Sequence, residues 1–272
     1  MHIFVHNVSM PFTLAHAAAA LPFRRLRLVP SALIVGTFAP DFEYFLCLTP
    51  GVGFGHTLRG TFALTLPLAM LVLWIFHALV KVPVTRLLPN TIQCRVVTHL
   101  DRFRFFGPIR FMLIVGSVLL GIATHLLWDS FTHPSTWLYN HWTFLSQMVR
   151  LPIVGSVAYY KVFQHSSTII GIGILLVWLV RWYHATRPGS QALERSLSPA
   201  KKLGIVCFVF ALASLGAVVL AIAVDGMPTG ILTFKVFVGR VLVAAIALTW
   251  WLFVAYGLFY RYMHRQIPML IS

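Results

Sequence analysis

Five apolar segments of this 272-residue chain are long enough to cross a lipid bilayer, and they constrain its fold more than any other feature. They cover residues 61–80, 111–128, 166–183, 203–224 and 241–260. A helix needs about 17–25 mostly apolar residues to span the hydrocarbon core. In lipid, only helices and closed barrels satisfy every backbone polar group. We therefore predict an all-α, polytopic membrane protein with about five transmembrane helices.

The composition agrees with this fold and argues against a soluble protein. Hydrophobic residues make up 59% of the chain and charged residues only 10%, whereas a soluble domain carries about 25% charged residues. The net charge of +15 would suggest nucleic acid in a soluble protein. Here the basic residues flank apolar spans, so we assign them to topology and to anionic lipid headgroups, and we expect no nucleic-acid partner.

The chain divides into four parts on this interpretation. Residues 1–60 form an N-terminal helical segment, 61–185 a membrane core, 186–202 a polar linker, and 203–272 a hairpin of two spans with a packing or anchoring role. Either Met1 or Met10 could be the true start. We expect no cleavable signal peptide, because the apolar run at 14–23 has its charges after it rather than before it.

The second span carries two ionisable residues near its end, His125 and Asp129. Residues four apart lie on the same face of a helix, with Cβ atoms about 5–6 Å apart. Ionisable side chains within a span are costly and are tolerated where they are paired or face a cavity. An imidazole and a carboxylate placed in this way can share one metal ion, and this is the interpretation we prefer.

Further candidate ligands lie elsewhere in the chain. His16 is on an Ala-rich segment predicted to be a short helix that ends near Pro22, and Asp41 precedes a predicted short helix at 42–48. His56 lies in the Gly-rich loop 49–60, where the backbone can approach a ligand. Two later candidates are His133 and His165. No C-x-x-C pairs Cys47, Cys94 or Cys207, so we expect His and carboxylate ligands, not thiolates.

The predicted spans bring all seven candidates to one membrane face. If residues 1–60 stay on the side of the N-terminus, that side holds 8 of the 21 Lys and Arg residues and the opposite side holds 13. Arg24, Arg25 and Arg27 count toward the first side and Arg181 toward the second. Basic loops favour the cytoplasm, so we expect an integral protein of the cytoplasmic membrane, with its site on the face opposite the more basic loops.

Each candidate also has a plain structural interpretation, and these alternatives stay open. Asp41 could only cap its helix, His16 could only pack between helices, and the pair on the second span could be an interfacial hydrogen bond. His133 and His165 could equally lie at headgroup level. The acidic residues that we expect at surfaces or helix ends, outside any site, are Glu43, Asp101, Glu194 and Asp225.

The order of the candidates resembles an uncharacterised family of bacterial integral-membrane proteins that open with M-P-F-T-x-x-H. The matching residues are His16, P-D at 40–41, H-T at 56–57, T-H-x-x-x-D at 124–129 and T-H at 132–133. That family is similar to the membrane-bound metal-dependent hydrolases and, more remotely, to the zinc-dependent phospholipase C fold. The resemblance covers roughly 10–173 and implies a helical, phospholipase-C-like metal site at one membrane face.

The phospholipase pattern continues with His-x-x-x-Glu, whereas His165 is followed four residues later by Ile169. The resemblance therefore implies one or two metal ions rather than three. His and carboxylate ligands suit Zn²⁺ best. We expect a metal-dependent hydrolase of a lipid-linked ester or phosphoester, with Asp129 and His125 as catalytic residues and membrane lipid or a lipid-linked substrate as partner. The alternatives are a binding or assembly protein with a structural metal, and a proton-coupled transporter.

Overall fold

The computed structural model describes residues 13–50, 53–97, 100, 103–134, 136–152, 155–189 and 197–266. Within this part of the chain, five helices are long and apolar enough to cross a membrane. They are Leu58–Leu87, α7 (Pro108–Thr132, the helical core of the second span), α9 (Tyr159–Ala185), α10 (Pro199–Asp225) and α11 (Ile231–Gln266). Each contains one predicted span, so the all-α membrane fold is confirmed. Met10, Asp101 and Glu194 lie outside the described residues.

The first long helix is built from α-helical and π-helical pieces. Its segments are α3 (Leu58–Gly60), η4 (Thr61–Thr65), α4 (Leu66–Ile75), η5 (Phe76–Val80) and α5 (Lys81–Leu87), and the short helix α6 (Asn90–Val96) follows it. The π turns η4 and η5 each widen the helix locally.

Local sequence signals explain where α7 begins and ends. Gly107 has φ +112°, a left-handed conformation that favours glycine, and Pro108 occupies the first turn, where its missing N–H is not needed. At the other end His133 is extended and precedes Pro134, which disfavours a helical conformation in the residue before it.

The N-terminal segment consists of short helices: η1 (Thr13–Arg25), α1 (Pro30–Phe38), η2 (Ala39–Asp41), α2 (Phe42–Cys47) and η3 (Phe54–His56). η1 is a 3₁₀ helix that runs through Pro22 to Arg25, so its predicted end near Pro22 is wrong. Pro22 is exposed, and its missing N–H costs the helix no more than one hydrogen bond.

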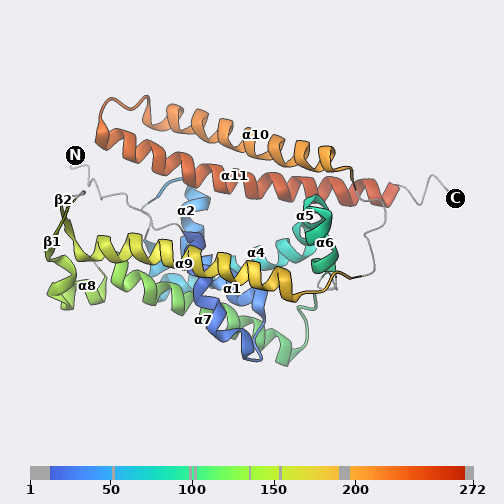
Figure 1. The fold of residues 1–272 in the computed structure, drawn as a ribbon, viewed down its shortest axis with the longest axis horizontal. Coiled ribbons are helices and arrows are strands. Elements are labelled where there is room, and N and C mark those ends of the chain that lie inside the picture. Colours follow the sequence, from blue (N-terminus) through green and yellow to red (C-terminus); the bar gives the residue numbers. More distant parts are fainter. Residues whose placement is uncertain are drawn as a thin grey trace.

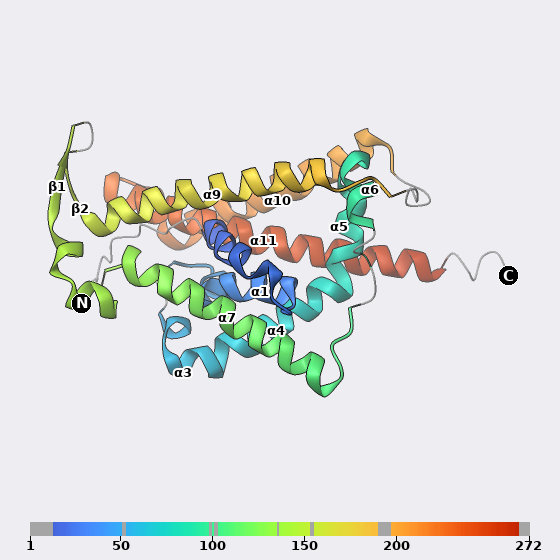
Figure 2. The same cartoon turned by 60° about the horizontal axis from the view of Figure 1, so that its bottom comes forward.

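η1 and α1 form a helical hairpin that enters the bundle and packs against α7 and α9 (Figure 2). The backbone N–H of Val29, at the turn, donates to Ser117 Oγ on α7 at 2.9 Å. Farther along, Gly36 of α1 meets Gly121 of α7, and a Cβ on either glycine would collide with the backbone of the other helix. Small residues at a crossing let helix backbones approach closely in lipid.

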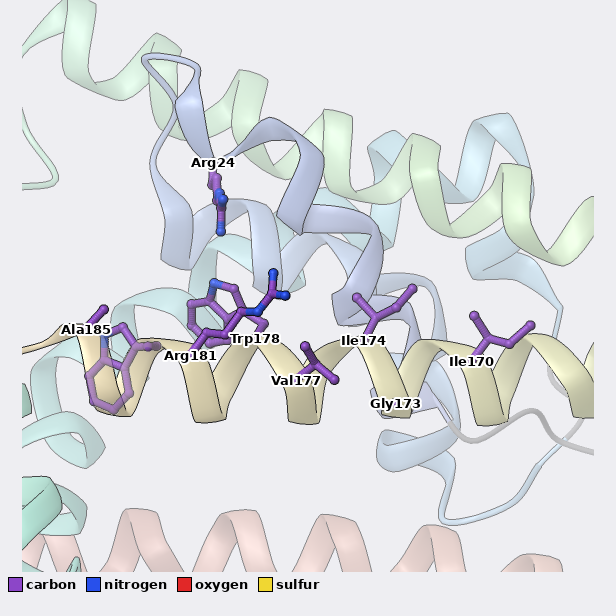
Figure 3. A pocket seen from close by; sticks show the side chains of 9 residues that line it. Arg24, Ile170, Gly173, Ile174, Val177, Trp178, Arg181 and Ala185 are labelled. Carbon is purple, nitrogen blue, oxygen red and sulfur yellow. The ribbon is translucent and has the colours of Figure 1, made fainter.

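The hairpin corrects the predicted topology of the basic residues. Arg24, at the end of η1, lines a pocket together with Arg181 and Ala185 at the C-terminal end of α9 (Figure 3). The turn of the hairpin therefore lies at the end of the bundle opposite Asp41. Moving Arg24, Arg25 and Arg27 to that end changes the count from 8 against 13 to 5 against 16. The lengths of the short segments alone do not reveal that they fold into a hairpin inside the bundle.

α10 and α11 form an antiparallel pair along one side of the molecule (Figure 1). Their contact uses small buried residues, including Ala213, Ala217 and Ala244. α11 also packs against α2 and α5, and Arg240 pairs with Asp225 through Nε and Oδ2 at 2.6 Å. The Nζ of Lys202 donates to the carbonyl of Leu88 at 3.1 Å. Arg240 Nη1 donates to the carbonyl of Leu48 at 3.3 Å, so the α10–α11 pair is held to the core at both ends of the bundle.

The connection between α7 and α9 contains α8 (Trp137–His141), η7 (Thr143–Ser146) and two antiparallel strands that the sequence analysis does not predict. These strands are β1 (Met148–Leu151) and β2 (Gly155–Ala158), with Met148 opposite Ala158 and Leu151 opposite Gly155. Trp137 and Trp142 are exposed here. Exposed tryptophans at one end of a membrane bundle are typical of the interfacial belt.

Candidate metal centre

Asp129 of α7 is the centre of a cluster of side chains at one end of the bundle. α7 presents His125, Asp129 and His133 at intervals of four residues, so the three share one helix face. His125 is fully buried and Asp129 is 6% exposed. A buried carboxylate needs partners to remain charged, and here imidazoles surround it.

The two oxygens of Asp129 face different histidines. Oδ1 lies 3.5 Å from Nε2 of His16 and 3.4 Å from Nδ1 of His133. Oδ2 lies 3.4 Å from Nε2 of His56 and 3.1 Å from Nε2 of His125. One carboxylate thus touches two pairs of imidazoles, one pair on each side.

Asp41 completes one side of the cluster. Its Oδ1 lies 3.4 Å from Nε2 of His56 and 3.7 Å from Nε2 of His125. Asp41 precedes α2, but its side chain makes no capping hydrogen bond. Instead its Oδ2 accepts from the hydroxyl of Thr13 at 2.7 Å. The capping interpretation of Asp41 is therefore wrong.

His16 reaches the cluster from η1 and is buried among alanines. Its ring stacks on that of His125, with centroids 4.1 Å apart and planes at 19°. η1 lies close to α7 and α9 because the residues at this contact are small: Ala15 of η1 packs tightly against Gly171 of α9. The Ala-rich sequence therefore serves to let this helix approach.

His56 is carried by a loop that a buried carboxylate fixes. The backbone N–H of Gly55 donates to Glu43 Oε2 at 2.8 Å, and Thr65 Oγ1 donates to the carbonyl of Gly55 at 3.1 Å. A Cβ at Gly55 would approach the carbonyl of Pro40 to 2.7 Å, so only glycine fits between the loop and η2. Glu43 lies in the first turn of α2, a helix end as expected, but it is only 8% exposed and positions this loop.

These separations suit a shared cation better than direct hydrogen bonds. Nε2 of His125 and Oδ1 of Asp129 are buried and have no hydrogen-bond partner among the described residues. Ligands held tetrahedrally at about 2.0–2.1 Å from Zn²⁺ lie about 3.3 Å from one another, close to the 3.1–3.7 Å found here. Two sets of three ligand atoms each fit around one point: His16, His125 and Asp129, and Asp41, His56 and His125.

A backbone contact orients the most buried imidazole for metal binding. Nδ1 of His125 lies 2.8 Å from the carbonyl oxygen of Thr37 on α1. A carbonyl only accepts, so Nδ1 carries the proton and Nε2 directs its lone pair toward Asp41 and Asp129. Metal-binding histidines are typically fixed in this way by a second hydrogen bond.

The charges of the groups outside the spans follow from burial and from one another. Burial, together with the neighbouring His125, lowers the pKa of His16 to about 4, so its imidazole is neutral. Burial opposes charge on Asp41 and His56, but their attraction outweighs it. The imidazoles of His125 and His56 hold the pKa of Asp41 below its usual value, and the carboxylates of Asp129 and Asp41 raise the pKa of His56 to about 9.

The structure brings together six of the seven sequence-predicted residues. His16, Asp41, His56, His125 and Asp129 form one connected cluster, with nitrogen–oxygen distances of 3.1–3.7 Å, and His133 adjoins Asp129 with 28% of its side chain exposed. His165 does not join them, because it is exposed on α9 whereas its neighbour Gln164 is buried. One residue is a rotation of about 100° on a helix, which turns His165 outward.

Sequence reasoning missed four residues that support the cluster: Thr13, Thr37, Glu43 and Tyr44. Thr37 acts through its carbonyl, which no side-chain pattern reveals. Tyr44 stacks on His56 with centroids 5.8 Å apart, and burial raises its pKa, so the phenol stays protonated. Thr13 is part of the T-x-x-H segment, and that motif was the one available signal.

The fold and site together define a polytopic α-helical membrane protein with a buried cluster of histidines and aspartates at one end of its bundle. The chain belongs to a family described as a domain of unknown function, DUF4184, whose model matches residues 10–258. No curated protein and no solved structure matches the chain. The match agrees with the predicted uncharacterised family, whereas the likeness to hydrolases and to phospholipase C stays a prediction.

Proposed function

We propose that this protein is a membrane-embedded, metal-dependent hydrolase of a lipid-linked ester or phosphoester. The observation that carries the proposal is the placement of Asp129, whose two oxygens each face two imidazoles. A carboxylate shared between two sets of ligands is the usual bridge of two-metal hydrolytic sites. The predicted likeness to membrane-bound metal-dependent hydrolases supports the same activity.

The donor set fits a divalent first-row metal, most simply Zn²⁺. Asp41, His56 and His125 with Oδ2 of Asp129 would hold one ion, and His16 and His133 with Oδ1 of Asp129 would hold a second if two are bound. When bound, such a metal supplies a water whose pKa is near 7 and polarises an acyl or phosphoryl oxygen. His56 and His133 are the partly exposed members, so substrate reaches the cluster past them.

The position of the cluster supports an amphiphilic substrate and an orientation. It lies at the end of the bundle that carries 5 of the 21 basic residues, which favours the non-cytoplasmic face of the membrane. At that boundary, the headgroup of a lipid can meet the ligands while its chain stays in the leaflet. We place the site there, opposite the more basic loops.

Metal content per chain tests the proposal. Purified wild-type protein should hold one or two ions per chain, and Asp129→Asn should lose most of them. Asp225→Asn is the matched control, because Asp225 pairs with Arg240 outside the cluster. Equal metal content in the wild type and Asp129→Asn would contradict the proposed site.

A structural role for the metal is the second candidate, and one observation favours it. The ligands come from η1, η2, η3 and α7, so an ion would also tie the N-terminal segment to the bundle. Hydrolysis of lipid phosphoesters and thermal unfolding, measured on His125→Ala, separate the two roles. Loss of hydrolysis in a protein that still unfolds cooperatively supports catalysis, whereas loss of the fold supports the structural role.

A further inference from the structure

An apolar cavity of about 530 Å³ lies beside the candidate metal centre, between the N-terminal segment and the helices α4 and α11. Volumes of about 300–1,000 Å³ are typical of small-molecule sites. Among the described residues that line it, only Thr13 and Ser31 carry a hydroxyl and none is charged. A polar or ionic ligand would therefore lose its hydrogen bonds to water there without replacement, whereas a hydrocarbon chain has none to lose.

The cavity is elongated along two helices. On α1 its lining residues are Ser31, Ile34, Val35 and Phe38, which follow the spacing of one helix face. On α4 and η5 they are Leu68, Leu71, Val72, Ile75 and Phe76, with the same spacing. At 1.5 Å per residue, these faces extend about 10–12 Å. The shape suits a linear chain.

One end of the cavity touches the candidate ligands. Thr13 lines the cavity and donates its hydroxyl to Asp41 Oδ2 at 2.7 Å, and the lining residue Phe42 directly follows Asp41. At the other end Ser31 Oγ lies 2.9 Å from Nε2 of His77, near the opposite end of the first span. A chain that runs along the cavity therefore begins at the metal centre and points into the membrane.

The cavity is open toward the lipid. Ile34, Leu71, Ile246 and Trp251 line it and are also exposed on the surface of the bundle. Leu71 and the α11 residues belong to membrane-spanning helices. The medium that meets this opening is the hydrocarbon interior of the bilayer, so a lipid chain can enter sideways from the leaflet.

We propose that this cavity binds one hydrocarbon chain of the lipid substrate while its ester or phosphoester head lies at the metal centre. The inference rests on the proposed hydrolase function and adds the recognition of the chain to it. Binding of a chain buries apolar surface, which gives roughly a fourfold gain in affinity per added methylene until the cavity is filled.

Photolabelling of the full-length protein in nanodiscs tests the chain site directly. The probe is an alkyl phosphate with a diazirine at the end of its chain, offered with a butyl or an octyl chain, of which only the octyl chain is long enough to reach the far end of the cavity, and displaced by unlabelled alkyl phosphate. Labelled residues are located by mass spectrometry. We expect saturable labelling of cavity residues such as Ile75 and Trp250, and stronger labelling with the longer chain.

Variants that fill the cavity provide the second arm. Ala247 is buried and lines the cavity, so Ala247→Phe should reduce the saturable labelling at least tenfold. Ala255→Phe makes the same change at an exposed position of the same helix and should label like the wild type. Val72→Trp fills the cavity from α4 and serves as a second test if Ala247→Phe does not fold.

The outcomes separate the chain site from the proposed activity. Saturable labelling of the cavity in a protein that holds no metal would refute the hydrolase function and leave the chain site standing. Metal-dependent hydrolysis that is independent of chain length, with labelling spread over the outer faces of α9 and α10, would overturn the chain site alone. A covalent dimer cross-linked through the cavity would show that a second copy occupies it, and would overturn it too.

Discussion

Replacing Gly36 with alanine should separate α1 from α7 and weaken metal binding from a distance. A Cβ at Gly36 would lie 3.0 Å from the Cα of Gly121 and closer still to the carbonyl oxygen of Val118, whereas ordinary contact begins at 3.4 Å. The helices must therefore part by at least 0.4 Å, and by roughly 1 Å at the carbonyl.

This displacement matters because α1 holds two parts of the metal centre. The carbonyl of Thr37, the next residue, orients His125, and Asp41 follows α1 by three residues. Metal sites tolerate deviations of about 0.2 Å in ligand distance. Disturbing the contacts that orient ligands typically costs about 10–100-fold in affinity, and overpacking costs about 1–3 kcal/mol of stability. We expect both losses in Gly36→Ala.

The assay is metal affinity by competition with a chelator, beside thermal unfolding in the same detergent. Gly116→Ala is the matched control, since Gly116 lies on α7 with nothing within 4 Å of an added Cβ. It should keep wild-type affinity and gain slightly in stability, because alanine favours a helix. Gly36→Ala that binds metal as tightly as Gly116→Ala would refute the reasoning.

Three other predictions concern the surroundings of the cluster. Glu43→Ala should lower metal affinity about 10–100-fold, because it releases the loop that carries His56. Glu43→Gln keeps an acceptor for the N–H of Gly55 and should recover most of that affinity. If a chelator titration shows that both variants lose the same affinity, this positioning role is excluded. Metal affinity should fall about tenfold per pH unit as the pH drops below about 9, because the imidazole of His56, whose pKa is raised to about 9 by Asp129 and Asp41, must lose its proton to bind. Affinity that is constant from pH 7 to pH 5 would contradict histidine ligation. Lys202→Met should lower stability by about 1.5–3 kcal/mol with unchanged metal content, and a loss of metal there would show that the two ends of the bundle are coupled.

The spans could be predicted because their signal is local. The placement of most candidate ligands could be predicted because successive loops alternate between the two membrane faces. Apolar length alone marks a membrane helix, and five crossings assign each loop to a side. That reasoning placed His16, Asp41 and His56 beside Asp129 correctly even though it put the turn at Arg24 at the wrong end. The error was harmless to the cluster because a hairpin that enters and returns leaves both of its ends where they began.

The remaining features depend on tertiary contacts between residues far apart in the chain, and no local sequence pattern indicates such contacts. Glu43 looks like a surface residue at the start of a short helix, and only the fold of the 53–57 loop over it makes it buried. The Gly36–Gly121 crossing pairs residues 85 positions apart, and either glycine alone is uninformative. The role of His165 depended on helix rotation, which one residue of offset decides.

The proposed orientation can be read from two native cysteines at opposite ends of the bundle. Cys47 is exposed at the end of α2, six residues after Asp41, and Cys94 lies in α6 at the end where α9 finishes. The backbone contact from Gly189 to the carbonyl of Cys94 fixes that placement. If the 16 basic residues mark the cytoplasm, Cys47 faces outward with the metal centre.

A membrane-impermeant maleimide applied to intact cells should then label Cys47 and leave Cys94 unmodified until the cells are permeabilised. The experiment uses a Cys207→Ser background, and Cys47→Ser in that background should abolish labelling of intact cells. Labelling of Cys94 but not Cys47 would reverse the orientation and require a substrate from the cytoplasmic leaflet. The ligand cluster does not depend on this result, because either orientation leaves Asp129 and its four imidazoles at one end of the same bundle.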